Sequence, residues 1–213
     1  MNRQFINLLI IKAAVILTFI PFNNVFAQNN PSNEWFSGHP IHFAFGNNIH
    51  SLPFRNILRS DPFYPSVSLG TEFNLKEGKY GKLLQMLNLG GFYQRYSARG
   101  IYLSTNTAWR FGIAYGFDSS LGIGLGYLHI FHPEAVYEYK SGEYEQVRDW
   151  GSARLMIDII LEIGYNFSEK SNQPIRFFMR YKPFLFLYRE DLPVMNGCTQ
   201  LGVYFFLNRL WRS

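Results

Sequence analysis

Alternation of apolar and polar residues with a two-residue period is the feature that most limits what this chain can fold into. About eight segments follow this pattern between residues 41 and 207, and it is the period of a β-strand. Turn-forming residues separate the segments. The segments are 41–45, 67–73, 85–95, 101–115, 121–127, 154–163, 176–187 and 199–207. The pattern therefore predicts an all-β protein.

Ionised residues fall almost entirely on the polar face of these segments. That face carries Glu72, Arg110, Arg154, Asp158, Glu162, Arg176, Arg180 and Lys182, whereas the apolar face carries only Arg95, at a segment end. The polar faces are otherwise rich in Gly, Ala and Ser, which suit a narrow barrel lumen better than a water-covered surface. An arginine turned toward lipid near the membrane midplane would cost about 2–4 kcal/mol. We therefore expect a closed antiparallel transmembrane β-barrel of about eight strands, arranged as an up-and-down meander.

The N-terminus of the 213-residue chain resembles a secretory leader. Residues 1–27 contain Arg3 and Lys12, no acidic residue, an apolar run and a small-residue cleavage pattern that ends at Ala27. The alternative, a membrane-anchoring helix, needs a longer apolar run. We expect a signal peptide over 1–27, a flexible lead-in over 28–40, a barrel over 41–207, and a tail or the end of the last strand over 208–213.

Composition excludes several classes of protein. Loss of the leader lowers the formal net charge from +5 to +3, and no Lys/Arg-rich block remains, so nucleic-acid binding has no support. Cys198 is the only cysteine, so no internal disulfide can form. Beyond the leader, no stretch is long and apolar enough for a transmembrane helix, so entry into a membrane requires a closed barrel.

The connections between segments are predicted to differ in length at the two ends of the barrel. Turns at one end would cover 76–82, 117–120 and 168–174. Loops at the other end would cover 46–66, 97–100, 132–150 and 189–198, and three of these four are longer than the turns. Short periplasmic turns and long outward loops are typical of bacterial outer-membrane barrels.

The leader, the alternating segments and the loop asymmetry resemble the small OmpA/OmpX-type outer-membrane barrels over most of residues 41–207. The resemblance implies insertion by the barrel-assembly machinery. We also expect an outer-membrane location, contact with outer-membrane lipid and lipopolysaccharide, a monomer and no cofactor. It departs at the C-terminus, where such barrels usually end on an aromatic residue. This chain continues past Phe206 to Ser213.

The lumen of such a barrel is just wide enough for side chains to fill it. We therefore expect the eight inward charges to form an ion-pair network, because buried charges must be paired. Five of the eight are basic, so a basic cavity that attracts anions is the alternative.

Two features near the outer end of 121–127 bear on function. His129, His132 and Glu134 are candidate metal ligands, but the two histidines have opposite parity, so we expect interface histidines and no metal site. Outer-membrane lipid A deacylases carry a His and a Ser two residues apart on a lipid-facing strand. Here Phe131 follows His129 at that spacing.

The long loop after this segment is the remaining candidate for function. It contains Tyr137, Tyr139 and Tyr144, with a possible hairpin turn at 141–142, and with His132 these tyrosines could form a contact surface. The sequence thus predicts a non-enzymatic barrel whose outward loops contact the surface or a partner, and assigns no catalytic residue. A lipid-modifying enzyme and a narrow porin are the alternatives.

Overall fold

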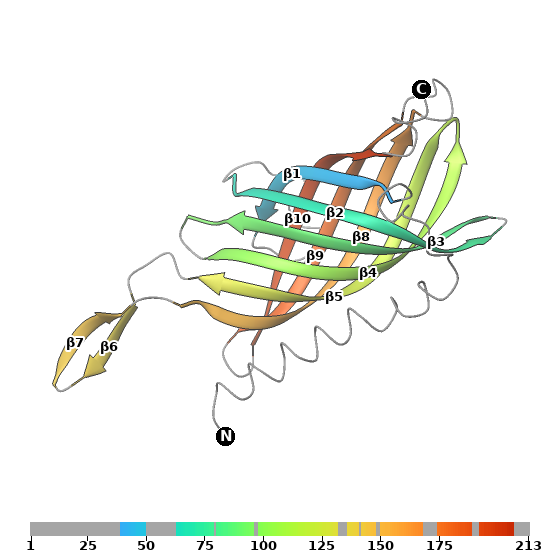
Figure 1. Ribbon diagram of the computed structural model, residues 1–213. Helices are drawn as coiled ribbons and strands as arrows, with labels where there is room; N and C mark the ends of the chain where they lie inside the picture. The colour runs from blue at the N-terminus through green and yellow to red at the C-terminus, as the bar shows by residue number, and fades with distance from the viewer. Residues whose placement is uncertain are drawn as a thin grey trace, which may run out of the picture.

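The computed structural model describes residues 39–49, 63–78, 80–95, 98–131, 136–140, 142–147, 150–167, 174–188 and 192–206. Eight of its strands form a closed barrel in the order β1-β10-β9-β8-β5-β4-β3-β2, with every pairing antiparallel (Figure 1). The barrel strands are β1 (Ile41–Ile49), β2 (Pro65–Gly78), β3 (Gly81–Tyr93), β4 (Arg99–Ala114), β5 (Phe117–Phe131), β8 (Ser152–Asn166), β9 (Ile175–Tyr188) and β10 (Leu192–Phe205). The predicted fold, an antiparallel barrel with an up-and-down meander, is confirmed.

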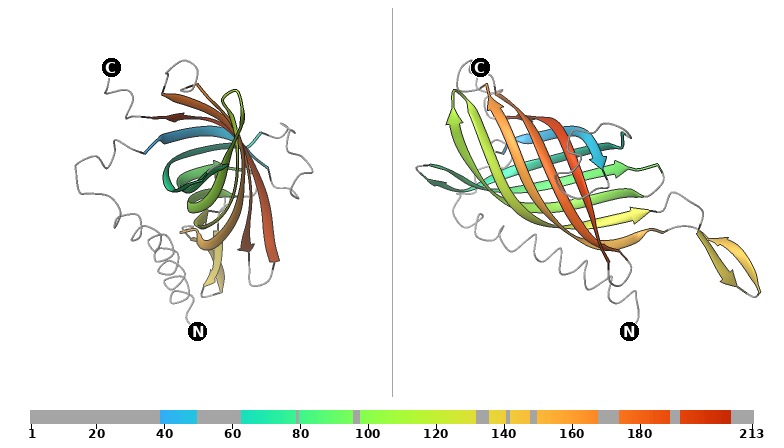
Figure 2. Two further views of the ribbon diagram at one scale, coloured as in Figure 1. Left: turned by 90° about the vertical axis from the view of Figure 1, so that its right-hand side faces the viewer. Right: turned by 180° about the vertical axis from the view of Figure 1, so that it is seen from behind.

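A two-stranded sheet interrupts the meander between β5 and β8. It consists of β6 (Val136–Lys140) and β7 (Glu143–Val147), paired with each other and not with the barrel. This hairpin projects beyond one end of the barrel, away from the turns that join β4 to β5 and β2 to β3 (Figures 1 and 2). That end is therefore the outward one.

The polarity of the wall is the reverse of that in a water-soluble protein. Along β5, Leu121 and Ile123 are 55% and 64% exposed on the outer wall, and they alternate with buried glycines of the lumen. In contrast, Arg180 of β9 is 0% exposed. Ionised groups are almost never fully buried in soluble domains, whereas outer-membrane barrels present an apolar band to lipid. Among the described residues, no helix is long and apolar enough to cross a membrane.

Strands are longer and turns tighter than the sequence pattern predicted. Residues 117–120, predicted as a turn, are the start of β5, and the turn is Tyr115 and Gly116 with φ of 54° and 88°. Positive φ at both central residues defines the type I′ turn, which matches the twist of the flanking strands. Similarly, β10 begins at Leu192, inside the predicted loop 189–198. The hydrogen-bonded ladder therefore continues beyond the segments in which the apolar alternation is regular.

Small residues on β5 make room for the larger side chains of neighbouring strands. A Cβ added at Gly124 would lie 2.5 Å from Oδ1 of Asp158 on β8 and would also overlap the amide of Asn106 on β4. The glycines of β5 are therefore required by the contents of the lumen, and they explain the Gly/Ala/Ser content of the polar faces.

Candidate functional site

Glu162 is the centre of an ion cluster in the half of the lumen nearer the short turns. Its Oε1 accepts hydrogen bonds from Arg176 at 2.8 Å and from Arg110 at 3.3 Å. Its Oε2 lies 2.7 Å from Nη2 of Arg180. The side chain of Glu162 is 0% exposed, so three guanidinium groups replace water around one carboxylate. Arg110 reaches it across β5, where Ser120 also accepts a bond of 3.0 Å from its Nε.

Two further carboxylates hold the arginines on either side of Glu162. Glu72 accepts two bonds of 2.7 Å from Arg110, which is the bidentate geometry that carboxylates and guanidinium groups favour. Asp118 binds Arg176, and one of the two bonds, from Nε to Oδ2, is 2.7 Å long. Asp118 was missed by the sequence analysis because it falls in the segment predicted as a turn. Asp118 is an even number of residues from Gly122 and Gly124, so it lies on the same face of the strand, and this spacing could have placed it in the lumen.

The network continues toward the outer end through neutral and charged groups. Arg180 donates to Asn88 at 3.1 Å and to the hydroxyl of Tyr204 at 2.8 Å. Lys182 lies 3.0 Å from Oδ2 of Asp158 and donates to Ser104 at 2.8 Å. Asn106 donates to Asp158 and accepts from Asn88 at 2.9 Å, and so joins the two ion groups.

Charge within this network is balanced. Four cations, Arg110, Arg176, Arg180 and Lys182, meet four carboxylates, Glu72, Asp118, Asp158 and Glu162. The structure thus brings together seven of the eight predicted lumen charges and adds Asp118. Arg154 lies farther out, opposite Leu128, and is partly exposed. The excess of positive charge on which an anion-attracting cavity would depend is therefore absent from the network.

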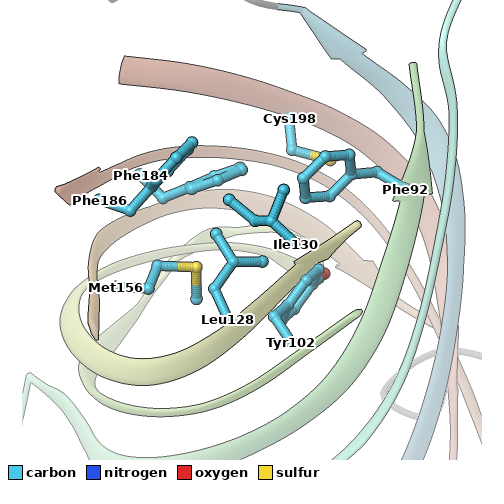
Figure 3. Close-up of a cluster of buried hydrophobic side chains, with 8 residues drawn as sticks. All are labelled: Phe92, Tyr102, Leu128, Ile130, Met156, Phe184, Phe186 and Cys198. Carbon is cyan, nitrogen blue, oxygen red and sulfur yellow. The ribbon is translucent and has the colours of Figure 1, made fainter. Parts of the chain in front are cut away.

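The outer half of the lumen contains an apolar cluster, a feature that the sequence analysis missed. Leu128 and Met156 are 0% exposed, and no member of the cluster is more than 5% exposed. The cluster comprises Phe92, Tyr102, Leu128, Ile130, Met156, Phe184, Phe186 and Cys198, which converge from six strands inside the barrel (Figure 3). The sequence contained an indication of this cluster, because segment 85–95 has apolar residues on its otherwise polar face. These residues weakened the alternation in that segment. The ion network therefore lies in the half of the lumen nearer the short turns, and the apolar cluster lies in the outer half.

His129 lies on the outer wall of β5 with both ring nitrogens engaged. Its Nε2 lies 2.9 Å from the backbone oxygen of Trp150, which can only accept, so Nε2 carries the hydrogen. Nδ1 lies 2.8 Å from the hydroxyl of Tyr127, from which the neutral imidazole accepts a hydrogen bond. The residues beside His129 in the register are Ile101 and Ala153, so neither strand neighbour supplies a nucleophile.

The other predicted residues of the outer end are only partly described. His132 and Glu134 lie outside the described residues, within which no group of three metal-ligating side chains occurs. The predicted hairpin is present, with Gly142 at φ 98° in its turn and Tyr139 paired opposite Tyr144. Tyr137 is paired opposite Gln146, and the side chain of Tyr144 is 74% exposed.

A closed eight-stranded barrel with an apolar outer wall and a charged interior defines a class, the small β-barrels of the bacterial outer membrane. The protein is an integral outer-membrane barrel of this class.

Comparisons with known proteins give similarity of fold only. No protein-family model matches the sequence, and no curated protein matches it. The outer membrane enzyme PagL has a similar structure, with 10% identity over 78% of this chain and 98% of PagL and a TM-score of 0.46. Neisserial surface protein A has 11% identity over 78% of this chain and 94% of its own, with a TM-score of 0.42. The N-terminal β-barrel domain of Pseudomonas aeruginosa OprF has 16% identity over 79% of this chain and 97% of its own, with a TM-score of 0.41.

Proposed function

We propose that this protein is a closed, non-enzymatic barrel that acts through its outward surface and conducts no solute. The filled lumen carries the proposal. Arg176, Arg180 and Lys182, which are long and charged, are 1%, 0% and 2% exposed, and the apolar cluster lies between them and the outer mouth. A solute would have to displace both layers.

The ion network also makes spontaneous opening unfavourable. Glu162 contacts three arginines, and two of these arginines are held by further carboxylates, so no single side chain can swing aside without breaking several charge-assisted hydrogen bonds. Each such bond contributes about 1.5–3 kcal/mol. The lumen is therefore better suited to holding the strands together than to transport.

The outward hairpin supports a role in contact. Strands β6 and β7 extend past the barrel wall and bring tyrosines into register, with Tyr139 opposite Tyr144 (Figure 1). Tyrosine provides a large contact area at low conformational cost. A two-stranded sheet with unpaired edges is also available for pairing with another chain.

Lipid chemistry receives less support from the same geometry. A general base must reach the proton that it removes, and the Nδ1 of His129 is occupied by Tyr127. Phe131, at the position where a deacylase has serine, contacts His129 with a ring-centroid distance of 4.7 Å. The local arrangement is an aromatic belt.

Two measurements test the proposal. In planar bilayers, the folded barrel should give no single-channel steps under conditions in which a general porin conducts, and resolved steps from the wild-type protein would refute the closed lumen. In cells that overproduce the protein, lipid A should keep its mass. Loss of an acyl chain in the presence of wild type but not of His129→Ala would establish the enzymatic alternative. A gel-mobility change on boiling verifies folding of each sample.

A further inference from the structure

The outer rim of β3, β4 and β5 carries a cation on the wall that faces lipid. Arg99 is the first residue of β4 and shares its parity with Ile101 and Leu103, which are 55% and 39% exposed on that wall. In the outer half of the wall, Arg99 is the only charged residue of the described barrel strands that faces outward. Because a charge on the lipid side is unfavourable unless it reaches the headgroups, this residue requires an explanation.

Aromatic residues flank Arg99 in the same cross-strand row. The register places Tyr93 beside it on β3 and Phe131 beside it on β5. The central carbon of the guanidinium group lies 5.1 Å from the centroid of the Tyr93 ring, which is within the range of a cation–π interaction. Among the described residues, no carboxylate forms an ion pair with Arg99, and its guanidinium group contacts the Tyr93 ring.

The row lies at the level of the lipid headgroups. Phe131, His129 and Tyr127 form a continuous line of rings along β5, with centroid distances of 4.7 and 6.0 Å, and the neighbouring Trp150 is 74% exposed. Aromatic belts of this kind mark the boundary between hydrocarbon and headgroups. A planar guanidinium group at that boundary matches a phosphate in geometry as well as in charge.

We propose that Arg99, held against Tyr93 at the outer rim, binds a phosphate of an outer-leaflet lipid whose acyl chains lie along Ile101 and Leu103. A phosphorylated, acylated lipid matches both parts of this surface. Its phosphate matches the cation at the rim, and its acyl chains match the apolar wall beneath it. This inference rests on the proposed function, because it names the lipid that the outward surface of the closed barrel contacts.

Stability in nanodiscs of defined composition tests this site. The folded chain is reconstituted in phosphatidylcholine nanodiscs that contain increasing fractions of bisphosphorylated lipid A, and the thermal midpoint of unfolding is read from the gel-mobility change on boiling. We expect the midpoint to rise with lipid A and not with its dephosphorylated form. Arg99→Gln should weaken the apparent affinity by about tenfold, because it removes a hydrogen bond to a charged group. Arg99→Lys keeps the charge but not the planar guanidinium group, so its apparent affinity should lie between those of wild type and Arg99→Gln.

A matched control removes a cation from the opposite end of the barrel. Lys82 is exposed and lies 2.9 Å from Glu77, and Lys82→Gln should leave lipid A binding unchanged. Equal stabilisation by the dephosphorylated lipid, or equal affinity of Arg99→Gln and wild type, would overturn the inference. Stabilisation by inorganic phosphate alone would assign the site to a free anion and also overturn it. The two proposals can fail separately. If the barrel gives no conductance but shows no phosphate-dependent stabilisation, only the lipid site is refuted. If it conducts but is stabilised by phosphorylated lipid A, only the closed lumen is refuted.

Discussion

Replacing Glu162 by Gln isolates the contribution of the ion cluster to stability. The substitution keeps the shape of the side chain and removes the charge that three guanidinium groups share. Arg110 retains Glu72 and Arg176 retains Asp118, so Arg180 is left as the uncompensated buried charge. Removal of one partner from a buried ion pair lowers the free energy of unfolding by about 3–5 kcal/mol. We expect a loss in that range.

The measurement is urea unfolding of the barrel in lipid vesicles, followed by tryptophan fluorescence and by the mobility of unboiled samples. The midpoint should fall for Glu162→Gln, while the dependence on urea stays that of a cooperative transition. Adding Arg180→Met to Glu162→Gln should recover part of the loss, because it removes the orphaned charge. A positive coupling of this kind is expected only for groups in contact.

Controls define the result that would refute this reasoning. Glu77→Gln removes a carboxylate that is paired with Lys82 at 2.9 Å but lies on the exposed surface, and it should not change the midpoint measurably. If Glu162→Gln unfolded at the same urea concentration as wild type, the cluster would contribute nothing to stability. If the double variant were no more stable than Glu162→Gln, Arg180 would not be the residue left uncompensated.

Three further substitutions test the wall and the lumen. Ile123→Arg, on the outer wall in the middle of β5, should destabilise the barrel in a bilayer by about 2–4 kcal/mol, whereas Ile113→Arg near the end of β4 should cost about 0–1 kcal/mol, as vesicle unfolding can measure. Phe184→Ala should lower the free energy of unfolding by about 3–5 kcal/mol through loss of packing in the apolar cluster, without producing conductance in planar bilayers, because the ion network still closes the lumen. Cys198 is 3% exposed and should react with a maleimide only after urea unfolding, and rapid labelling of the folded barrel would show that the outer lumen is open.

The strands could be predicted from the sequence because lipid on one side and a narrow lumen on the other impose opposite demands on alternate residues. This contrast is clearest in β4, from Ile101 to Ile113, and the predicted segment agrees closely with the strand. The ends of strands were harder to place. Asp118 and Ser119 resemble turn residues in sequence, yet they belong to β5 because both are paired with residues of β4 and β8.

Contacts across the lumen could not be derived from the sequence. Arg110 meets Glu162 over an intervening strand, and Arg180 meets Asn88 from the opposite wall. Such pairs depend on the stagger of the strands and on the diameter of the closed barrel, which no local pattern encodes. The apolar cluster was missed for a related reason. Leu128 and Ile130 alternate with His129 and Phe131, so both faces of that segment are apolar or aromatic and the parity gives no contrast.

The pairing that closes the barrel joins its first strand to its last. Ile41 lies opposite Phe205, and nine such positions link β1 to β10. Until β10 is in place, β1 and β9 each present a row of backbone N–H and C=O groups without partners, and hydrocarbon cannot satisfy them. A chain that stops early therefore loses far more than one strand, since what remains is an open sheet that a bilayer rejects. Because the barrel closes only when β10 pairs with β1, the final strand decides whether all the preceding strands can form a structure that a bilayer accepts.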